Sequence, residues 1–346
     1  MTDTLPGVSY VMPVLNEAVY IENAILTVLG QDYAGAKELI LALGPSTDGT
    51  TEIVEKLAAA DPRILTVHNP ETDIPVGLNK AIAASSHRII VRVDAHSELE
   101  PGYTTRAIET LERTGAANVG GIMRARGQTP FQQAAARGYN SKFGLGGGRY
   151  HGGASEGPAE SAYLGVFRRD VLEEVGGFDE TLRRGEDWEL NLRIRAAGHV
   201  VWFDPELAVT YWPRESLTKL ARQFAATGTW RGELVRRYGG RNPWRFFVPP
   251  LLVIALAIGV IVFMLQVTGV LHGVASAVAS LVYLAPITYV LLVLWLAFVA
   301  DRGSTWRDKW FFTLVLPTMH LCWGSGFIVG VVRGARDTID TSRTEI

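Results

Sequence analysis

The N-terminal two thirds of the chain alternate between short apolar runs and stretches in which apolar residues recur at helical spacing. Residues 8–14, 38–43 and 64–67 have the length and apolar content of buried β-strands. A fourth strand is expected over residues 89–93. The stretch after the first run carries apolar residues on one helical face: Ile21, Ile25, Val28 and Leu29. This strand–helix repeat predicts an α/β fold with a parallel sheet covered by helices on both faces.

The segments that join these elements contain helix caps and turn formers. Asn16, followed by Glu17 in the first turn, is expected to cap the first helix. Residues 44–50 are rich in glycine, proline and polar residues, which is typical of a turn. No glycine-rich phosphate loop of either common type follows the first strand, so nucleotide binding requires a different scheme.

The last third of the chain contains three long apolar runs. Residues 246–271 and 274–300 have no charged side chain and are long enough to span a bilayer, whereas the run 310–332 is interrupted by Pro317 and His320. Tryptophans lie near the ends of these runs, as interfacial aromatics do: Trp244, Trp295, Trp306 and Trp310. We therefore predict four regions: a cytoplasmic α/β domain that carries the candidate site residues given below, an amphipathic interfacial helical region, a transmembrane region and a tail, over residues 1–215, 216–243, 244–335 and 336–346.

Basic residues flank the first two apolar runs on the sides that face away from their connection. These residues are Arg237, Arg241 and Arg245 before the first run, and Arg302, Arg307 and Lys309 after the second. Because such residues favour the cytoplasmic side, the two runs are expected to form a hairpin with a short outer loop around His272. A third crossing would leave Arg333 and Arg336 outside, against the same rule, so this run is expected either to cross, to be re-entrant or to lie in the interface.

Composition excludes several functional classes. The chain of 346 residues has a formal net charge of −2 and shows no electrostatic footprint for nucleic-acid binding. Cys322 is the only cysteine, which excludes an internal disulfide framework and a cysteine-based zinc site. Residues 1–7 lack the basic and apolar segments of a cleavable signal peptide, so the N-terminal part is expected to stay in the cytoplasm.

Asp94 and His96 follow the fourth predicted strand directly. Ligands collect at the carboxyl ends of strands in open α/β sheets. In an extended backbone these alternate side chains point the same way, and a carboxylate with an imidazole can hold a divalent cation that in turn holds a diphosphate. The alternative is that Asp94 caps a turn and His96 is a surface residue.

Five short motifs occur in the order seen in family 2 glycosyltransferases: residues 13–17, 46–50, 77–81, 93–96 and 185–188. The chain resembles this family over about residues 5–235, and more loosely over the apolar C-terminal part. The resemblance is strongest to its succinoglycan-type glucosyltransferase branch, which also tends to show Asp-Ala-His where others show Asp-x-Asp. The resemblance implies a GT-A fold, a nucleotide-sugar donor, a divalent cation (Mg²⁺ or Mn²⁺) and inversion at the anomeric carbon.

The resemblance also implies roles for donor-binding residues. Pro13 and Glu17 match the pocket for the base and ribose, and Asp48 matches the acid that reads the base, commonly uracil. Asn79 and Lys80 lie where the family approaches the nucleotide. Each residue also has a structural alternative: Glu17 as a helix-dipole acid, Asp48 as a turn residue, and the pair Asn79 and Lys80 as a solvated helix start.

Asp94 takes the place of the first acid of Asp-x-Asp, on ribose and metal, and His96 takes the place of the second. This departure leaves the second carboxylate ligand open, although imidazole suits manganese-like ions. Asp187 resembles the general base, with Glu186 beside it, at the start of a helix after Gly185. A helix N-terminus favours the ionised carboxylate, as a base requires. The alternative is that both acids only cap this helix.

Two further segments bear on the reaction. Residues 144–153 contain many glycines and are expected to form a mobile loop that closes over donor and acceptor. Trp230 and Arg231 resemble part of the Gln-x-x-Arg-Trp motif of processive synthases, but Gln223 lies seven residues before Trp230, which argues against processive polymerisation. They are candidates for contact with the diphosphate or the acceptor, within a predicted surface helix over residues 217–238.

The predicted function is a membrane-anchored, inverting, metal-dependent glycosyltransferase in the inner membrane of a bacterial-type cell. It would move a sugar from a nucleotide-sugar, UDP-sugar favoured, to a lipid-linked, polyprenyl-type glycan acceptor in exopolysaccharide or cell-envelope assembly, in contact with membrane lipids and without nucleic acid. The alternatives are transfer to a polyprenyl phosphate and, in a different class, a non-catalytic nucleotide-sensing membrane protein.

Overall fold

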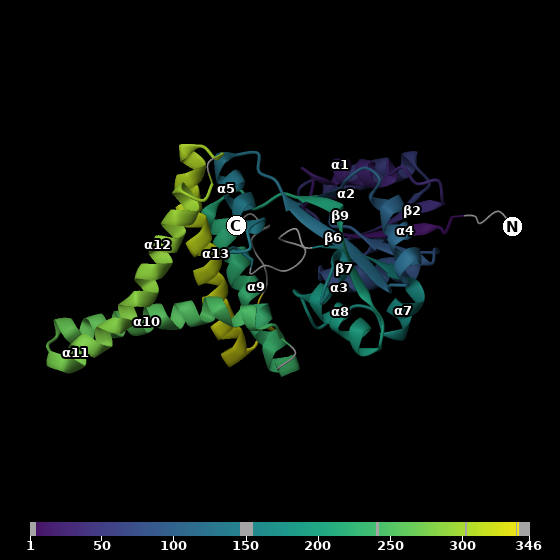
Figure 1. Cartoon of the computed structure of the whole chain (residues 1–346). Coiled ribbons are helices and arrows are strands. Elements are labelled where there is room, and N and C mark those ends of the chain that lie inside the picture. Colours follow the sequence, from purple (N-terminus) through teal and green to yellow (C-terminus); the bar gives the residue numbers. More distant parts are fainter. Residues whose placement is uncertain (1–4, 146–154, 240–241, 302, 337, 339–346) are drawn as a thin grey trace. The chain divides into compact units, whose positions relative to one another are not determined.

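The computed structural model describes the chain except for residues 1–4, 146–154, 240–241, 302, 337 and 339–346. It forms two compact units (Figure 1). The α/β unit comprises residues 1–126 and 140–212, and the helical unit comprises residues 127–139 and 213–346. The helical unit thus includes a segment from within the predicted catalytic domain of residues 1–215. Most of the predicted mobile loop, 144–153, and most of the predicted tail lie outside the described residues, as do Arg241 and Arg302.

The first half of the α/β unit has the predicted strand–helix repeat. Its elements are β1 (Val8–Val14), α1 (Ile21–Leu29), β2 (Lys37–Leu43), α2 (Thr50–Ala60), β3 (Ile64–His68), α3 (Ile74–Ala84) and β4 (Ile89–Arg92). β1 pairs in parallel with both β2 and β4, and β3 pairs in parallel with β2. The prediction of a parallel sheet is confirmed for these strands, whose carboxyl ends therefore lie at one edge.

The second half of the unit changes strand direction. It contains β5 (Ser97–Leu99), α4 (Tyr103–Thr114), β6 (Asn118–Ala125), β7 (Gly157–Pro158), β8 (Tyr163–Arg168), α7 (Arg169–Glu174), α8 (Glu186–Ala196) and β9 (Val201–Tyr211). β8 is antiparallel to β4 and β6, and β5 and β7 are antiparallel to β9. The sheet is therefore mixed, in the order β3-β2-β1-β4-β8-β6-β9-β5 with β7 on β9. Apolar periodicity predicts strands but not their direction.

Both faces of the sheet are buried. Tyr10 and Met12 of β1 belong to one apolar layer, whereas Val11 between them belongs to the other, as the alternation of side chains along a strand requires. α1 buries the predicted face. The prediction that Asn16 caps α1 is wrong, because α1 begins at Ile21 and Asn16 has a left-handed backbone with φ of 54°. The Asn16 side chain instead accepts a hydrogen bond of 2.8 Å from the Thr47 amide, on the turn after β2.

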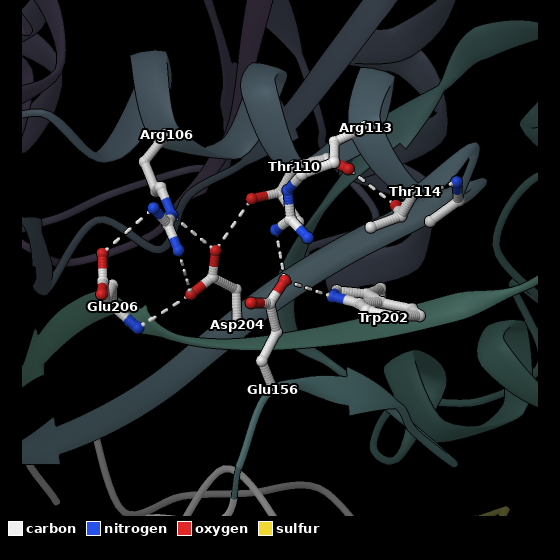
Figure 2. Close-up of polar contacts among 9 residues, drawn as sticks. Arg106, Thr110, Arg113, Thr114, Glu156, Trp202, Asp204 and Glu206 are labelled. Carbon is white, nitrogen blue, oxygen red and sulfur yellow. Dashed lines mark hydrogen bonds and ion pairs between the residues drawn. The ribbon is translucent and has the colours of Figure 1, made fainter.

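A polar network around a buried carboxylate joins α4 to β9 (Figure 2). Asp204 of β9 is fully buried and accepts hydrogen bonds from Arg106 (2.7 Å), Thr110 (2.8 Å) and the Glu206 amide (3.0 Å). Beside it, Glu156 accepts from Arg113 and from the Trp202 indole. Three donors around one buried carboxylate satisfy it, and these bonds hold α4 against β9.

The helical unit contains α5 (Pro130–Tyr139), α9 (Leu217–Tyr238), α10 (Val248–Val267), α11 (Gly273–Ala279), α12 (Leu284–Phe298) and α13 (Trp306–Arg333), with short 3₁₀ turns before α10 and α12. Within the described residues, three stretches are long and apolar enough to cross a membrane: Trp244–Val267, Gly273–Phe298 and Trp306–Arg333. They coincide with the three predicted apolar runs. α9 coincides with the predicted surface helix.

Candidate active site

Arg92 at the end of β4 lies at the centre of the candidate site. Its side chain is 4% exposed, and its guanidinium contacts Asp187, Glu186 (2.9 Å) and Asp94 (3.3 Å). Asp94 follows β4, whereas Glu186 and Asp187 form the first turn of α8, which Gly185 precedes with a φ of 78°. The fold thus brings together residues that lie more than 90 positions apart and that include both predicted catalytic acids.

Three carboxylates gather around the Arg92 guanidinium. Burial opposes the charge of Arg92, but the three acids outweigh it and raise the pKa of its guanidinium. Burial also raises the pKa of the Asp187 carboxyl to about 8; Arg92 opposes this shift, and Glu186 and Asp94 add to it. The expectation that the helix dipole keeps Asp187 ionised is therefore corrected: desolvation and two neighbouring acids outweigh the dipole. A pKa near physiological pH suits a general base.

His96, the second predicted metal ligand, faces a different partner from Asp94. Its Nδ1 atom lies 3.4 Å from Oε1 of Glu17, and both side chains are 6% exposed. The edge of Tyr211 packs on the imidazole with ring centroids 5.7 Å apart. The structure thus pairs a predicted metal ligand with a predicted donor-binding residue. Among the described residues, no group of three or more His, Cys, Asp or Glu side chains is arranged to hold a metal ion.

The loops after β1 and β2 are joined through Asp48. Its carboxylate accepts hydrogen bonds from the amides of Ala18 (3.0 Å) and Thr50 (3.1 Å), and the Thr50 hydroxyl accepts from the Glu17 amide at 2.8 Å. Burial alone would raise the pKa of the Asp48 carboxyl, but these hydrogen bonds outweigh burial and lower it. Asp48 and Glu17 are therefore brought together, next to β1, which contains Pro13. Asp48 keeps an exposed side chain, and its role in reading the base stays a prediction.

Asn79 and Lys80 make contacts within the fold. The Asn79 side chain donates to the Phe178 carbonyl (2.9 Å) and accepts from the Phe178 amide (2.9 Å), which ties α3 to the turn that leads toward α8. Lys80 forms an exposed ion pair with Glu71 at 2.5 Å. Contact of either residue with the nucleotide stays a prediction.

Trp230 and Arg231 belong to α9 in the helical unit. The Trp230 side chain is 2% exposed, and its indole N–H donates to the Thr338 carbonyl at 3.2 Å. The Arg231 guanidinium stacks over the Phe246 ring, 4.2 Å from its centroid. Both side chains therefore have a packing role in the structure, and contact with donor or acceptor stays a prediction.

Comparison with known proteins places this site in a family. The sequence profile of Glycosyl transferase family 2 matches residues 9–176. The succinoglycan biosynthesis protein ExoA of Rhizobium meliloti (strain 1021) is 31% identical over 319 residues, covering 92% of this chain and 92% of that protein. The chain belongs to glycosyltransferase family 2. It is therefore an enzyme of the glycosyltransferase class, and its resemblance to the succinoglycan-type branch is confirmed.

More distant relatives of this glycosyltransferase agree with the fold. The dolichyl N-acetyl-alpha-D-glucosaminyl phosphate 3-beta-D-2,3-diacetamido-2,3-dideoxy-beta-D-glucuronosyltransferase of Methanococcus voltae is 25% identical over 249 residues, covering 69% of this chain and 77% of that one. The structure of mannosyltransferase PcManGT from Pyrobaculum calidifontis, in complex with GDP-Man and Mn²⁺, aligns with a TM-score of 0.58 at 18% identity. That alignment covers 96% of this chain and 90% of the other, and supports the predicted GT-A fold followed by apolar helices.

Two residues at the site of this glycosyltransferase belong to none of the five motifs. Arg92 lies in a predicted strand, where a charged residue in an otherwise apolar, buried strand is a signal in itself. Tyr163 of β8 has a buried hydroxyl without a hydrogen-bond partner among the described residues. Burial and the nearby Asp94 raise the pKa of this hydroxyl well above its usual range. No motif indicated it.

Proposed function

We propose that this family 2 glycosyltransferase is a membrane-anchored, inverting enzyme that moves a sugar from a UDP-sugar to a lipid-linked glycan acceptor. Its role would lie in exopolysaccharide or cell-envelope assembly at the inner membrane of a bacterial-type cell, with the α/β unit in the cytoplasm. The observation that supports the chemistry best is the Arg92 cluster, in which the partly exposed carboxylates of Asp187 and Asp94 both contact the buried Arg92 guanidinium.

Asp187 is the proposed general base. The acceptor hydroxyl gives its proton to the Asp187 carboxylate while its oxygen attacks the anomeric carbon. The bond from that carbon to the nucleoside diphosphate breaks, and the diphosphate leaves with the electron pair. A single displacement of this kind inverts the anomeric centre. Arg92 positions the base through its contact with Asp187 and limits how far burial raises the pKa of that carboxyl.

A divalent cation fits the chemistry of the cluster, because three carboxylates gather around the Arg92 guanidinium and carboxylate oxygens are ligands for such ions. Asp94 is 18% exposed and is the proposed protein ligand. Mg²⁺ is commonly held by one or two carboxylates together with phosphate oxygens of the substrate, so a larger set of protein ligands is not required. His96 would serve as a second ligand only after turning from Glu17. When bound, the cation would neutralise charge on the leaving diphosphate.

The proposed identities of the donor and the acceptor are supported by the family resemblance and by the apolar helices. Glu17 and Asp48, on adjoining loops, are the proposed contacts to ribose and base, together with Pro13. The names of relatives support a role in glycan assembly: one is a succinoglycan biosynthesis protein, and another is named for a dolichyl-linked substrate. Three apolar helical stretches support an acceptor that stays in the bilayer, because tethering the enzyme there raises the effective concentration of the pair.

The test uses full-length protein in detergent with Mg²⁺ or Mn²⁺, a panel of UDP- and GDP-sugars, and release of nucleoside diphosphate as the readout. We expect release that a lipid-linked acceptor stimulates and that Asp187→Asn lowers by about 1,000-fold, within the range attributed to general-base catalysis.

Glu189→Gln is the matched control, because Glu189 lies on the same helix but pairs with Arg193 at 2.7 Å. It should retain transfer. Release without an acceptor requirement, or transfer that persists in Asp187→Asn, would overturn the proposed base. Stimulation by a polyprenyl phosphate in place of a lipid-linked glycan would move the acceptor to the simpler lipid.

A further inference from the structure

The last apolar helix, α13, differs from the other two apolar stretches in how much of it is covered. In its most apolar window 39% of residues are buried, against 11% and 17% for the stretches that contain α10 and α12. One face of α13 is apolar and exposed: Trp310, Leu314, Val329 and Val332. The opposite face packs on α5 and α9 (Figure 1). The neighbours of this face decide where the helix can lie.

α9 and α13 pack with their backbones in contact. Each carries a Gly-x-x-x-Gly pair, Gly228 and Gly232 on α9, and Gly326 and Gly330 on α13. A Cβ atom added at Gly228 would lie 2.0 Å from the Trp323 carbonyl oxygen, and one at Gly330 would lie 2.0 Å from the Thr229 carbonyl oxygen. Small residues of this kind allow helices to approach closely. The two helices are therefore one rigid pair, which must occupy a single place relative to the bilayer.

α9 has a charge pattern that the bilayer core does not accept. Its 22 residues include five cations and one acid: Lys219, Arg222, Arg231, Arg236, Arg237 and Glu233. Arg222 and Arg236 are exposed. Charged side chains at the centre of a bilayer are costly, whereas a helix with basic residues on one side is stable at its surface. The α9 partner thus excludes the C-terminal half of α13 from the bilayer core.

The N-terminal half of α13 is covered by α5. Phe131 packs edge-on against Phe311, the Arg137 guanidinium stacks over Phe312 at 4.1 Å, and Gly138 lies against Met319. Arg137 also pairs with Asp301, just before α13, at 3.1 Å. α5 has only 10 residues, too few to cross, and the chain enters it directly from β6. The first half of α13 is thus held against a helix that cannot leave the side on which the α/β unit lies.

Within the part of the chain that the structure describes, α10 and α12 are much less covered than α13. α10 contacts α13 near its own start, where Gly324 lies against the Pro249 carbonyl oxygen, and then leaves α13 (Figure 1). Apolar side chains of α10 are exposed along its length. α12 returns to α13, where Phe298 meets Trp310 with ring centroids 5.2 Å apart. Arg137 of α5 donates to the carbonyl oxygens of Leu296 and Ala297 at the end of α12, so this end lies beside a charged group.

We propose that only α10 and the α11–α12 segment enter the bilayer, as a hairpin, and that α13 lies with α9 and α5 in the membrane surface. The chain after α13 is then on the same side as the α/β unit. This arrangement places Arg245, Arg307 and Arg333 on one side of the membrane, as the charge rule for membrane proteins requires. The proposal rests on the membrane anchorage proposed above but not on sugar transfer, and its test does not use enzymatic activity.

The test places single cysteines in full-length protein in which Cys322, the only cysteine, is changed to Ala. Glu22→Cys marks the α/β unit, His272→Cys and Val270→Cys mark the hairpin tip, and Thr338→Cys follows α13. These side chains are exposed or partly exposed, and changing Thr338 leaves the nearby charges intact. A membrane-impermeant maleimide is applied to right-side-out and to inverted membranes, and labelling in detergent gives the total.

We expect the tip positions to react only in right-side-out membranes, and Glu22→Cys and Thr338→Cys only in inverted ones. Labelling of Thr338→Cys on the same face as the tip would show that α13 crosses and would overturn the proposal. Labelling of the tip on the same face as Glu22→Cys would overturn the hairpin.

A second measurement tests depth with a matched pair of positions. Val329 of α13 and Ile258 of α10 are each 45% exposed. A nitroxide attached to Val329→Cys should be relaxed several-fold more strongly by a water-soluble nickel chelate than one attached to Ile258→Cys, in protein reconstituted into bilayers. Equal, weak relaxation at both positions would place α13 in the bilayer core and contradict the proposal.

Discussion

Two acidic clusters of the α/β unit, one around the buried Asp204 and one around the buried Arg92, use the same residue types in opposite ways. In the cluster of Figure 2, Asp204 is surrounded by donors from Arg106, Thr110 and the Glu206 amide. Burial opposes its ionisation, but these hydrogen bonds outweigh burial and lower the pKa of Asp204. In the Arg92 cluster three acids contact the same guanidinium. There burial outweighs the effect of Arg92, and the pKa of Asp187 is raised to about 8.

The difference distinguishes a structural cluster from a reactive one. A buried carboxylate with enough donors is stable as an anion and has no tendency to exchange protons near neutral pH. A carboxylate that shares too few donors with its neighbours exchanges a proton in that range and attracts further positive charge. The contrast assigns stability to the Asp204 cluster and chemistry to the Arg92 cluster, and three changes test this assignment.

The largest effect is expected from Arg92→Lys. Lysine keeps the positive charge but lacks the planar fork with which Arg92 contacts Asp187 and Glu186 from different nitrogens. We expect kcat to fall roughly 100-fold, the scale attributed to misplacing a catalytic group, with a smaller change in KM for the donor. Steady-state kinetics on folded protein measure this. An unchanged kcat would show that Arg92 only packs the interior.

The pH dependence of sugar transfer tests the raised pKa of Asp187. Because the pKa of Asp187 is raised to about 8, the base is increasingly protonated below that pH. Transfer should therefore fall about tenfold for each pH unit well below 8 and level off above it. Arg92 opposes the rise in the pKa of Asp187, so Arg92→Lys, in which the cation is less closely held, should move this limb to higher pH. A rate that is constant between pH 6 and about 9 would contradict the assignment of the base.

The smallest effect on catalysis is expected at Asp204, where stability should change instead. Asp204→Asn places an amide N–H₂ among donors, and we expect a loss of about 2 kcal/mol in unfolding free energy, seen as a lower Tm, with kcat unchanged. The folded pKa of Asp204 is lowered, so its stabilisation is present above the unfolded pKa and is lost as pH falls through the folded value. The wild-type protein should therefore lose its Tm advantage over Asp204→Asn in acid.

Glu206→Gln is the control for that measurement. Glu206 is 70% exposed and pairs with Arg106 at 3.2 Å, and exposed pairs contribute little. Its Tm should stay close to the wild-type value. If Glu206→Gln and Asp204→Asn lowered Tm equally, burial would not be what separates the two acids.

Elements with a local sequence signal could be predicted without the fold. Apolar periodicity defined β1 to β4 and the buried face of α1, and long uncharged runs defined the three apolar helical stretches. The short motifs, in order, indicated the family and placed Asp187 at a helix start. These features were accessible because a residue's neighbours along the chain are enough to decide them.

Tertiary structure decided everything that depends on residues far apart in the chain. Apolar patterns carry no strand direction, so the antiparallel pairing of β8 with β4 became visible only in the fold. The contact of Arg92 with Asp187, the turn of His96 toward Glu17, and the packing of α5 on α13 each join segments that local patterns treat separately. The pKa of Asp187 is the clearest case: the helix dipole, which the sequence reveals, favours the anion, but burial and neighbouring acids, which only the fold supplies, outweigh it.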